Sequence, residues 1–187
     1  MTNANVPTKR ELLELLRGQA AEVDDAVRRL SGEQLEEGRY EGGWNARQIL
    51  AHVAAIEWTY PRLIDLAKGT RESAPPRTDA PAAAQAPRPA GVSPSAEPAA
   101  APAANPIDSY NARQVEKRAG ASAAELLDEF QKNRAALIAA VEATDDALFD
   151  VPIRSAGGAR GPLATVIKFV ALDHVGVHIR DLAGGDS

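Results

Sequence analysis

Residues 161–182 form an amphipathic segment that can adopt few structures other than a helix. Gly161 and Pro162 come first, and proline suits the first helical position because it has no amide hydrogen to lose. The residues that follow include two histidines and recur at three- and four-residue spacing, the period of one helix face: Leu163, Val166, Val170, His174, Val177 and His178. The segment therefore predicts one continuous helix whose buried face carries two imidazoles.

Three more segments have the same helical period, at about residues 8–30, 45–68 and 122–143. Each begins with a capping-box pattern, in which a short polar side chain and a Glu or Gln three residues later satisfy each other's free amides. A further pattern of this kind, at Ser31, predicts a short helical turn. We expect Pro61 to kink the second segment, because it cannot donate a backbone hydrogen bond, and Gly69 to end it.

The composition changes between Arg71 and Asn105, where the chain contains eight prolines among many alanines and serines. Such a stretch buries too little apolar surface to offset the entropy of ordering it. We expect a disordered or extended insertion, which is either a mobile lid over a site or a tolerated surface excursion, the simpler interpretation. A short helix is predicted from Pro106 to about Lys117, and a glycine-rich loop at 151–161.

These elements predict an all-α fold, a four-helix bundle without strands. The chain of 187 residues is expected to form one domain, residues 1–187, with the 71–105 insertion inside it. The second connection is long enough to cross the bundle instead of turning tightly.

The composition also limits the chemistry. The chain has no cysteine, which excludes disulfides, thiolate metal ligands and a cysteine nucleophile. A net charge of −5 gives no electrostatic attraction for nucleic acid. The N-terminus has no apolar signal region, and no run is apolar enough to span a membrane. We expect a soluble cytoplasmic protein with no nucleic-acid or membrane partner.

The histidines give the strongest functional signal. His174 and His178 are one helical turn apart, so both rings can point at one place. His52, the only other histidine, lies on the apolar side of the 45–68 segment. These could be buried histidines satisfied by hydrogen bonds, but a paired arrangement would crowd the rings unless something polar lay between them, which favours a metal. Three protein nitrogens with an open position are typical of catalytic zinc, although imidazole also suits nickel, cobalt and iron.

The motifs that carry these residues resemble a known family. Residues 43–52, Gly-Trp-Asn-Ala-Arg-Gln-Ile-Leu-Ala-His, resemble the opening of the second helix in the DinB-like superfamily, and His174-x3-His178 resembles its closing motif. The stretch 108–127, with Asn111-Ala112-Arg113 and a capped helix, is similar to the N-terminal type of the mycothiol-dependent maleylpyruvate isomerases.

The resemblance implies a four-helix bundle, often a homodimer, with a divalent metal, zinc or nickel, held by His52, His174 and His178. It further implies a small-molecule substrate. The activity would be S-transfer or isomerisation that depends on a low-molecular-weight thiol such as mycothiol or bacillithiol, or else hydrolysis.

Other residues near the motifs are weaker candidates, each with a structural alternative such as capping, core packing or a solvated charge. Asp181 could orient the ring of His178. Glu57 or Asp173 could act as a general base. The cofactor-binding candidates are Gln48, Trp44 and Tyr110.

Three functions are compatible with these features. The first is a metal-dependent thiol transferase or hydrolase acting on a small electrophile; without cysteine, its nucleophilic sulfur would come from a cofactor. The second is a non-catalytic metal- or ligand-binding bundle that serves as a sensor or interaction module, suggested by the lack of a convincing general base on the histidine face. The third is a structural bundle with neutral buried histidines and no metal.

Overall fold

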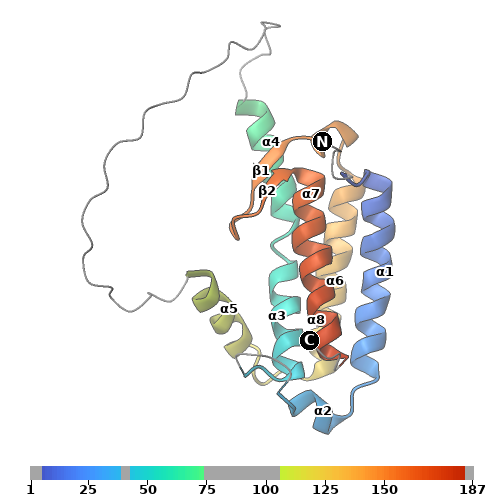
Figure 1. The fold of residues 1–187 in the computed structure, drawn as a ribbon, viewed down its shortest axis with the longest axis vertical. Coiled ribbons are helices and arrows are strands. Elements are labelled where there is room, and N and C mark those ends of the chain that lie inside the picture. Colours follow the sequence, from blue (N-terminus) through green and yellow to red (C-terminus); the bar gives the residue numbers. More distant parts are fainter. Residues whose placement is uncertain (1–5, 39–42, 74–105, 184–187) are drawn as a thin grey trace, which may run out of the picture.

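Four long helical columns run side by side in the computed structural model, which describes residues 6–38, 43–73 and 106–183 (Figure 1). The first and third are α1 (Lys9–Arg28) and α6 (Ala123–Glu142). The second consists of α3 (Ala46–Glu57) and α4 (Pro61–Ser73). The fourth is continuous through α7 (Leu163–Ile167), a π-helical segment η2 (Lys168–Asp173) and α8 (His174–Leu182). The predicted four-helix bundle is confirmed, and no described helix is long and apolar enough to cross a membrane.

The columns form a closed square in which α6 and α8 each contact both α1 and α3. α3 and α6 run in one direction and α1 and α8 in the other (Figure 1). Because α4 and the start of α6 lie at opposite ends, the connection between them crosses the bundle, as predicted. Its described part includes α5 (Pro106–Glu116), which packs on α3. Of the predicted insertion at 71–105, residues 71–73 belong to α4, and residues 74–105 lie outside the described residues.

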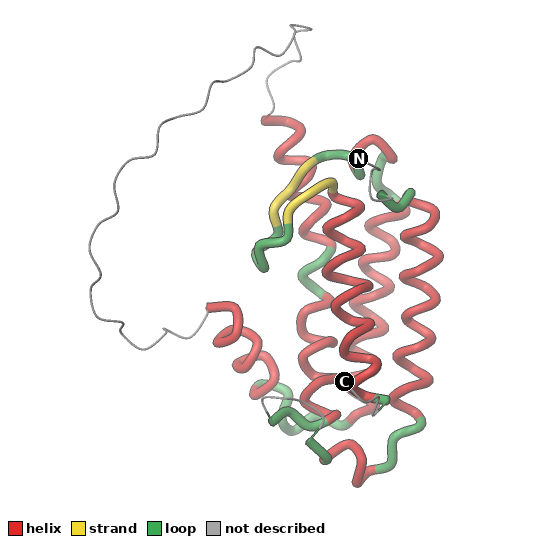
Figure 2. Tube along the Cα trace, viewed as in Figure 1, coloured by secondary structure: helices red, strands yellow, loops and turns green. Residues whose placement is uncertain are grey.

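The helix starts agree with the sequence prediction. Capping boxes at Thr8, Ser31, Asn45 and Ser122 open α1, the short α2 (Gly32–Glu36), α3 and α6. Pro61 does not kink a continuous helix. Instead α3 ends before it, a short turn follows (Figure 2), and Pro61 is the first residue of α4, where its missing amide costs nothing. The predicted stop at Gly69 is wrong, because α4 continues to Ser73.

The predicted loop at 151–161 is instead a small antiparallel hairpin of β1 (Pro152–Arg154) and β2 (Arg160–Pro162). Its turn is closed by the Ser155 hydroxyl, which accepts a hydrogen bond from the Ala159 amide. Strands of three residues are too short to show an alternating pattern. Pro162, predicted as the first helical residue, is therefore the last residue of β2, and the last helical column begins at Leu163.

The buried face of the last helical column also differs from the predicted one. Val177, placed on the core stripe by the sequence period, is 43% exposed. The cause is η2, where the amide of His174 donates to the carbonyl of Phe169, five residues back. The wider turn takes in one extra residue and shifts the stripe. The buried positions are then Ala171 and Leu172 within η2, and Val175, His178 and Leu182 in α8.

A polar layer divides the core into two apolar clusters. One cluster includes Leu12 and Leu16 of α1, and the other includes Val23 and Val27. Between them Gln19 of α1 meets the buried ion pair of Glu57 and Arg134. The two nearest atoms of the pair, Arg134 Nε and Glu57 Oε1, are 2.6 Å apart, and neither residue is exposed to solvent. Burial raises the pKa of Glu57 to about 7, against the opposing effect of Arg134.

This ion pair should be strongly coupled. Removal of one partner, in Arg134→Met or Glu57→Leu, leaves an uncompensated buried polar group and should cost about 3–5 kcal/mol of unfolding free energy. The double variant should lose much less than the sum of the two, measured by urea unfolding. The partly exposed pair of Arg118, in the turn before α6, and Glu129 of α6 is the control and should couple by less than about 1 kcal/mol. If the losses of unfolding free energy from the Arg134 and Glu57 variants were additive, the two residues would not be coupled as this prediction requires.

Candidate metal centre

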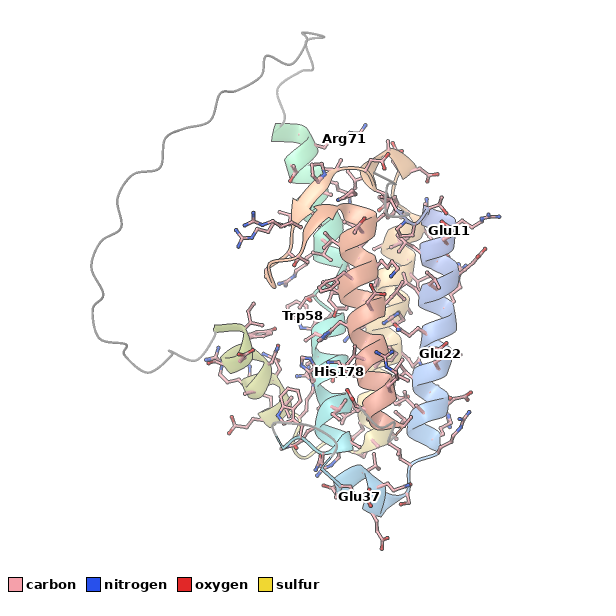
Figure 3. The ribbon with its side chains drawn as sticks, in the orientation of Figure 1. Glu11, Glu22, Glu37, Trp58, Arg71 and His178 are labelled. Atoms are coloured by element: carbon pink, nitrogen blue, oxygen red, sulfur yellow. The ribbon has the colours of Figure 1, made fainter. Side chains whose placement is uncertain are left out.

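Three histidine side chains converge between α3 and α8. His52 Nε2 lies 3.3 Å from His174 Nε2, and His178 Nε2 lies 3.1 Å from the same atom. One ligand nitrogen from each ring lies within 4.8 Å of the other two. Figure 3 shows His178 on the side of α8 that faces α3. The rings meet nearly edge to face, at interplanar angles of 80° to 85°, so the three nitrogens point at a shared space.

Local structure explains this convergence. The capped N-terminus of α3 places His52 on its buried face, where it is 3% exposed. His178 is buried on α8, one turn after His174. His174 comes directly after η2 and is the most open of the three. The site thus has two buried candidate ligands and a third at its accessible edge.

The donor set fits a divalent ion. A neutral imidazole offers one donor and one acceptor nitrogen, so the single Nε2 of His174 cannot satisfy both neighbouring Nε2 atoms. A tetrahedral ion with metal–nitrogen bonds of about 2.0–2.1 Å would separate its ligand nitrogens by about 3.3 Å. The distances around His174 are close to this value.

The protonation state also suits coordination, which needs neutral rings. Burial, followed by repulsion from His174, lowers the pKa of His52 to about 4. Burial lowers the pKa of His174 and of His178 as well, with Asp181 opposing the effect at His178. All three rings are therefore predominantly neutral at pH 7.

Two predicted supporting residues lie beside the cluster. Asp181 Oδ2 is 3.8 Å from His178 Nδ1, and this oxygen is buried without a hydrogen bond. Its position suits the predicted task of orienting His178, which stays a prediction. The ring of Trp44 lies 5.2 Å from that of His52, centroid to centroid. The Nδ1 atom of His52 is buried and makes no hydrogen bond within the described structure.

A pocket of about 280 Å³ opens between α3 and α5. Trp44 and Gln48, two of the predicted cofactor-binding residues, line it together with Ala51, Val115 and Arg118. Gln48 is also part of the α3 capping box, where its Oε1 accepts from the Asn45 amide. Tyr110, the third candidate, is a half-buried residue of α5 and is not part of this lining.

The two predicted general bases are engaged elsewhere. Glu57 is held in the buried pair with Arg134, and Asp173 is paired with Lys168 at 2.6 Å. A catalytic role for either stays a prediction.

Sequence reasoning missed Gln19 and Arg134. Both interrupt an apolar stripe, Gln19 between Leu16 and Val23 and Arg134 between Phe130 and Leu137. A polar residue at such a position signals a buried partner, although it does not say which one.

Comparison with known proteins agrees with this fold. The family model of the DinB superfamily matches residues 15–182. The chain belongs to the DinB superfamily. No curated protein matches it in sequence. A similar solved structure is that of a mycothiol-dependent maleylpyruvate isomerase carrying a histidine-to-alanine substitution, with a TM-score of 0.65 and 16% sequence identity. The alignment covers 97% of this chain but only 63% of that isomerase, and the likeness shows a shared fold.

The lowered pKa of His52 predicts a pH-dependent stability in the metal-free protein. The folded state binds fewer protons than the unfolded state between pH 6.5 and 4, so the contribution of neutral His52 to the free energy of unfolding is lost as the pH falls. Relative to His52→Leu, the wild type should lose about 3 kcal/mol of unfolding free energy between pH 7 and pH 4. Urea unfolding with a chelator measures this difference, and because both proteins contain Glu57, its titration cancels. A difference that does not change with pH would contradict the prediction.

Proposed function

We propose that this protein is a divalent-metal-dependent enzyme that joins a low-molecular-weight thiol to a small electrophile, or uses the thiol to isomerise it. The convergence of three neutral imidazole nitrogens at 3.1 and 3.3 Å carries the proposal. Membership of the DinB superfamily and the fold shared with a mycothiol-dependent isomerase support it.

In this proposal His52, His174 and His178 hold the ion. A bound zinc or nickel ion would supply a Lewis acid that lowers the pKa of a coordinated thiol or water. The protein keeps the three rings neutral by burial and leaves the accessible side of the site next to His174. Trp44 lies against His52 and also lines the pocket between α3 and α5, so the thiol or its substrate would be bound there, beside the metal.

Thiol chemistry suits this arrangement better than hydrolysis. A coordinated thiol is acidified by the metal itself and needs little help from a protein base. Hydrolysis usually recruits a carboxylate to activate water, and both predicted carboxylates are in ion pairs. The chain has no cysteine, so the sulfur would come from a thiol cofactor such as mycothiol or bacillithiol. Homodimerisation and the absence of nucleic-acid binding stay predictions.

The same carboxylate pairing supports a second candidate, a metal-binding bundle without turnover that acts as a sensor or interaction module. This candidate has the same metal site as the proposed enzyme but catalyses no reaction.

Metal content separates these two candidates from a purely structural bundle. Elemental analysis of the purified protein, after exposure to zinc or nickel and removal of excess metal, should give about one ion per chain, as one three-histidine site allows. His178→Ala should lose most of it. Asp173→Asn is the control and should keep it, because that carboxylate is paired with Lys168. Absence of metal in the wild type would overturn both metal-dependent candidates.

Turnover separates the enzyme from the sensor. Metal-loaded protein should accelerate the reaction of a low-molecular-weight thiol with a generic electrophile, and His52→Ala should reduce the rate to background. The measurement is loss of free thiol with time, across a panel of thiols and with ester substrates in parallel. A metal-loaded wild type no faster than His52→Ala on every combination would favour the sensor, whereas ester cleavage alone would favour hydrolysis.

A further inference from the structure

The π-helical segment η2 sets the rotation of the two histidines that follow it. One residue of an α-helix turns the chain by about 100°, so an extra residue turns everything after it by that amount relative to α7. His174 is the first residue after the segment. With regular α-helical hydrogen bonds throughout, His174 and His178 would face a different direction, and the meeting with His52 would be lost.

A π segment is rare and needs support from its surroundings, because its hydrogen bonds are less favourable than those of an α-helix. Two side chains from other helices provide bonds here. Arg134 Nη2 donates to the carbonyl of Ala171 at 2.9 Å, and Gln19 Nε2 donates to the carbonyl of Leu172 at 2.8 Å. Both carbonyls belong to η2, within three residues of His174.

The two donors are themselves held in place. Arg134 Nη1 donates to Gln19 Oε1 at 3.1 Å, and Arg134 Nη2 donates to Glu57 Oε2 at 3.1 Å. Arg134 is fully buried, and Gln19 is 8% exposed. A guanidinium with this many partners in a dry layer cannot move without leaving a buried group unsatisfied.

We infer that Gln19 and Arg134 are positioning residues of the candidate metal centre. By donating hydrogen bonds to two adjacent carbonyls of η2, they hold it in its π form. This fixes the rotation of α8 about its axis, at which His174 and His178 meet His52. The inference rests on the proposed metal site for its effect on metal binding, but its geometric part concerns the metal-free protein.

Gln19→Met is the informative variant. It removes the donor to Leu172 while the charged pair of Glu57 and Arg134 stays intact, so the fold is retained better than in an Arg134 variant. Gln131→Met is the matched control. Gln131 Nε2 also donates to an interhelical backbone carbonyl at 2.8 Å, that of Ala20, but this bond joins α6 to α1 and does not involve η2.

The first measurement is a Co²⁺ titration, in which binding is monitored by the visible absorption bands of the tetrahedral ion. Loss of a residue that orients metal ligands typically lowers metal affinity 10- to 100-fold. We expect a loss in this range for Gln19→Met, together with shifted bands, and neither change for Gln131→Met, with urea unfolding showing that both variants are folded. Unchanged affinity and bands in Gln19→Met would overturn the inference, as would equal losses in the two variants.

The second measurement needs no metal. In the chelator-treated wild type, nuclear Overhauser effects should connect the ring protons of His52 and His178, whose centroids are 5.0 Å apart. They should weaken or disappear in Gln19→Met and persist in Gln131→Met. If the wild type binds no metal but this difference is found, the proposed function fails and the positioning role stands. If the effects persist in Gln19→Met, the positioning role fails whether or not metal binds.

Discussion

The buried guanidinium of Arg134 is the interaction on which the arrangement of the bundle depends. From α6 it reaches Gln19 on α1, Glu57 on α3 and the Ala171 carbonyl of the last helical column, so all four columns meet at one side chain. Apolar contacts between helices tolerate small rotations and shifts, whereas hydrogen bonds in a dry interior do not. Because a charge buried without its partners is so costly, competing registers of the four columns are disfavoured. The apolar clusters on either side supply most of the burial, and the polar layer selects one arrangement of them.

The same layer lies next to the histidine cluster along both helices that build it. Glu57 follows His52 by five residues on α3, and the carbonyls held by Arg134 and Gln19 come shortly before His174. One set of buried hydrogen bonds therefore fixes both halves of the site relative to each other. His52 Nδ1 itself makes no hydrogen bond within the described structure that could fix the position of its ring. The relative position of the three histidines therefore depends on the neighbouring polar layer of Gln19, Glu57 and Arg134.

Features set by neighbouring residues could be predicted from the sequence, and features set by distant residues could not. The capping boxes at Thr8, Ser31, Asn45 and Ser122 are local patterns, and each is present. The three histidines could be grouped because helical spacing places His174 and His178 on one face and leaves His52 as the only other candidate. The π segment could not be predicted, because Gln19 and Arg134, which support it, lie 153 and 37 residues away from its carbonyls. Without it, helical counting placed Val177 in the core, where the structure leaves it exposed.

The composition of the histidine cluster argues for selection on function and not on stability. His52 lies among the apolar residues of the second cluster, where a leucine would pack without a buried polar nitrogen. Neutral imidazoles in such a place lose hydration, and the lowered pKa of His52 measures part of that loss. A bundle that only had to fold would be more stable with apolar residues at these positions. Three polar rings that meet edge to face around one shared space, in a chain with no other histidine, support the proposal of a ligand that all three bind at once.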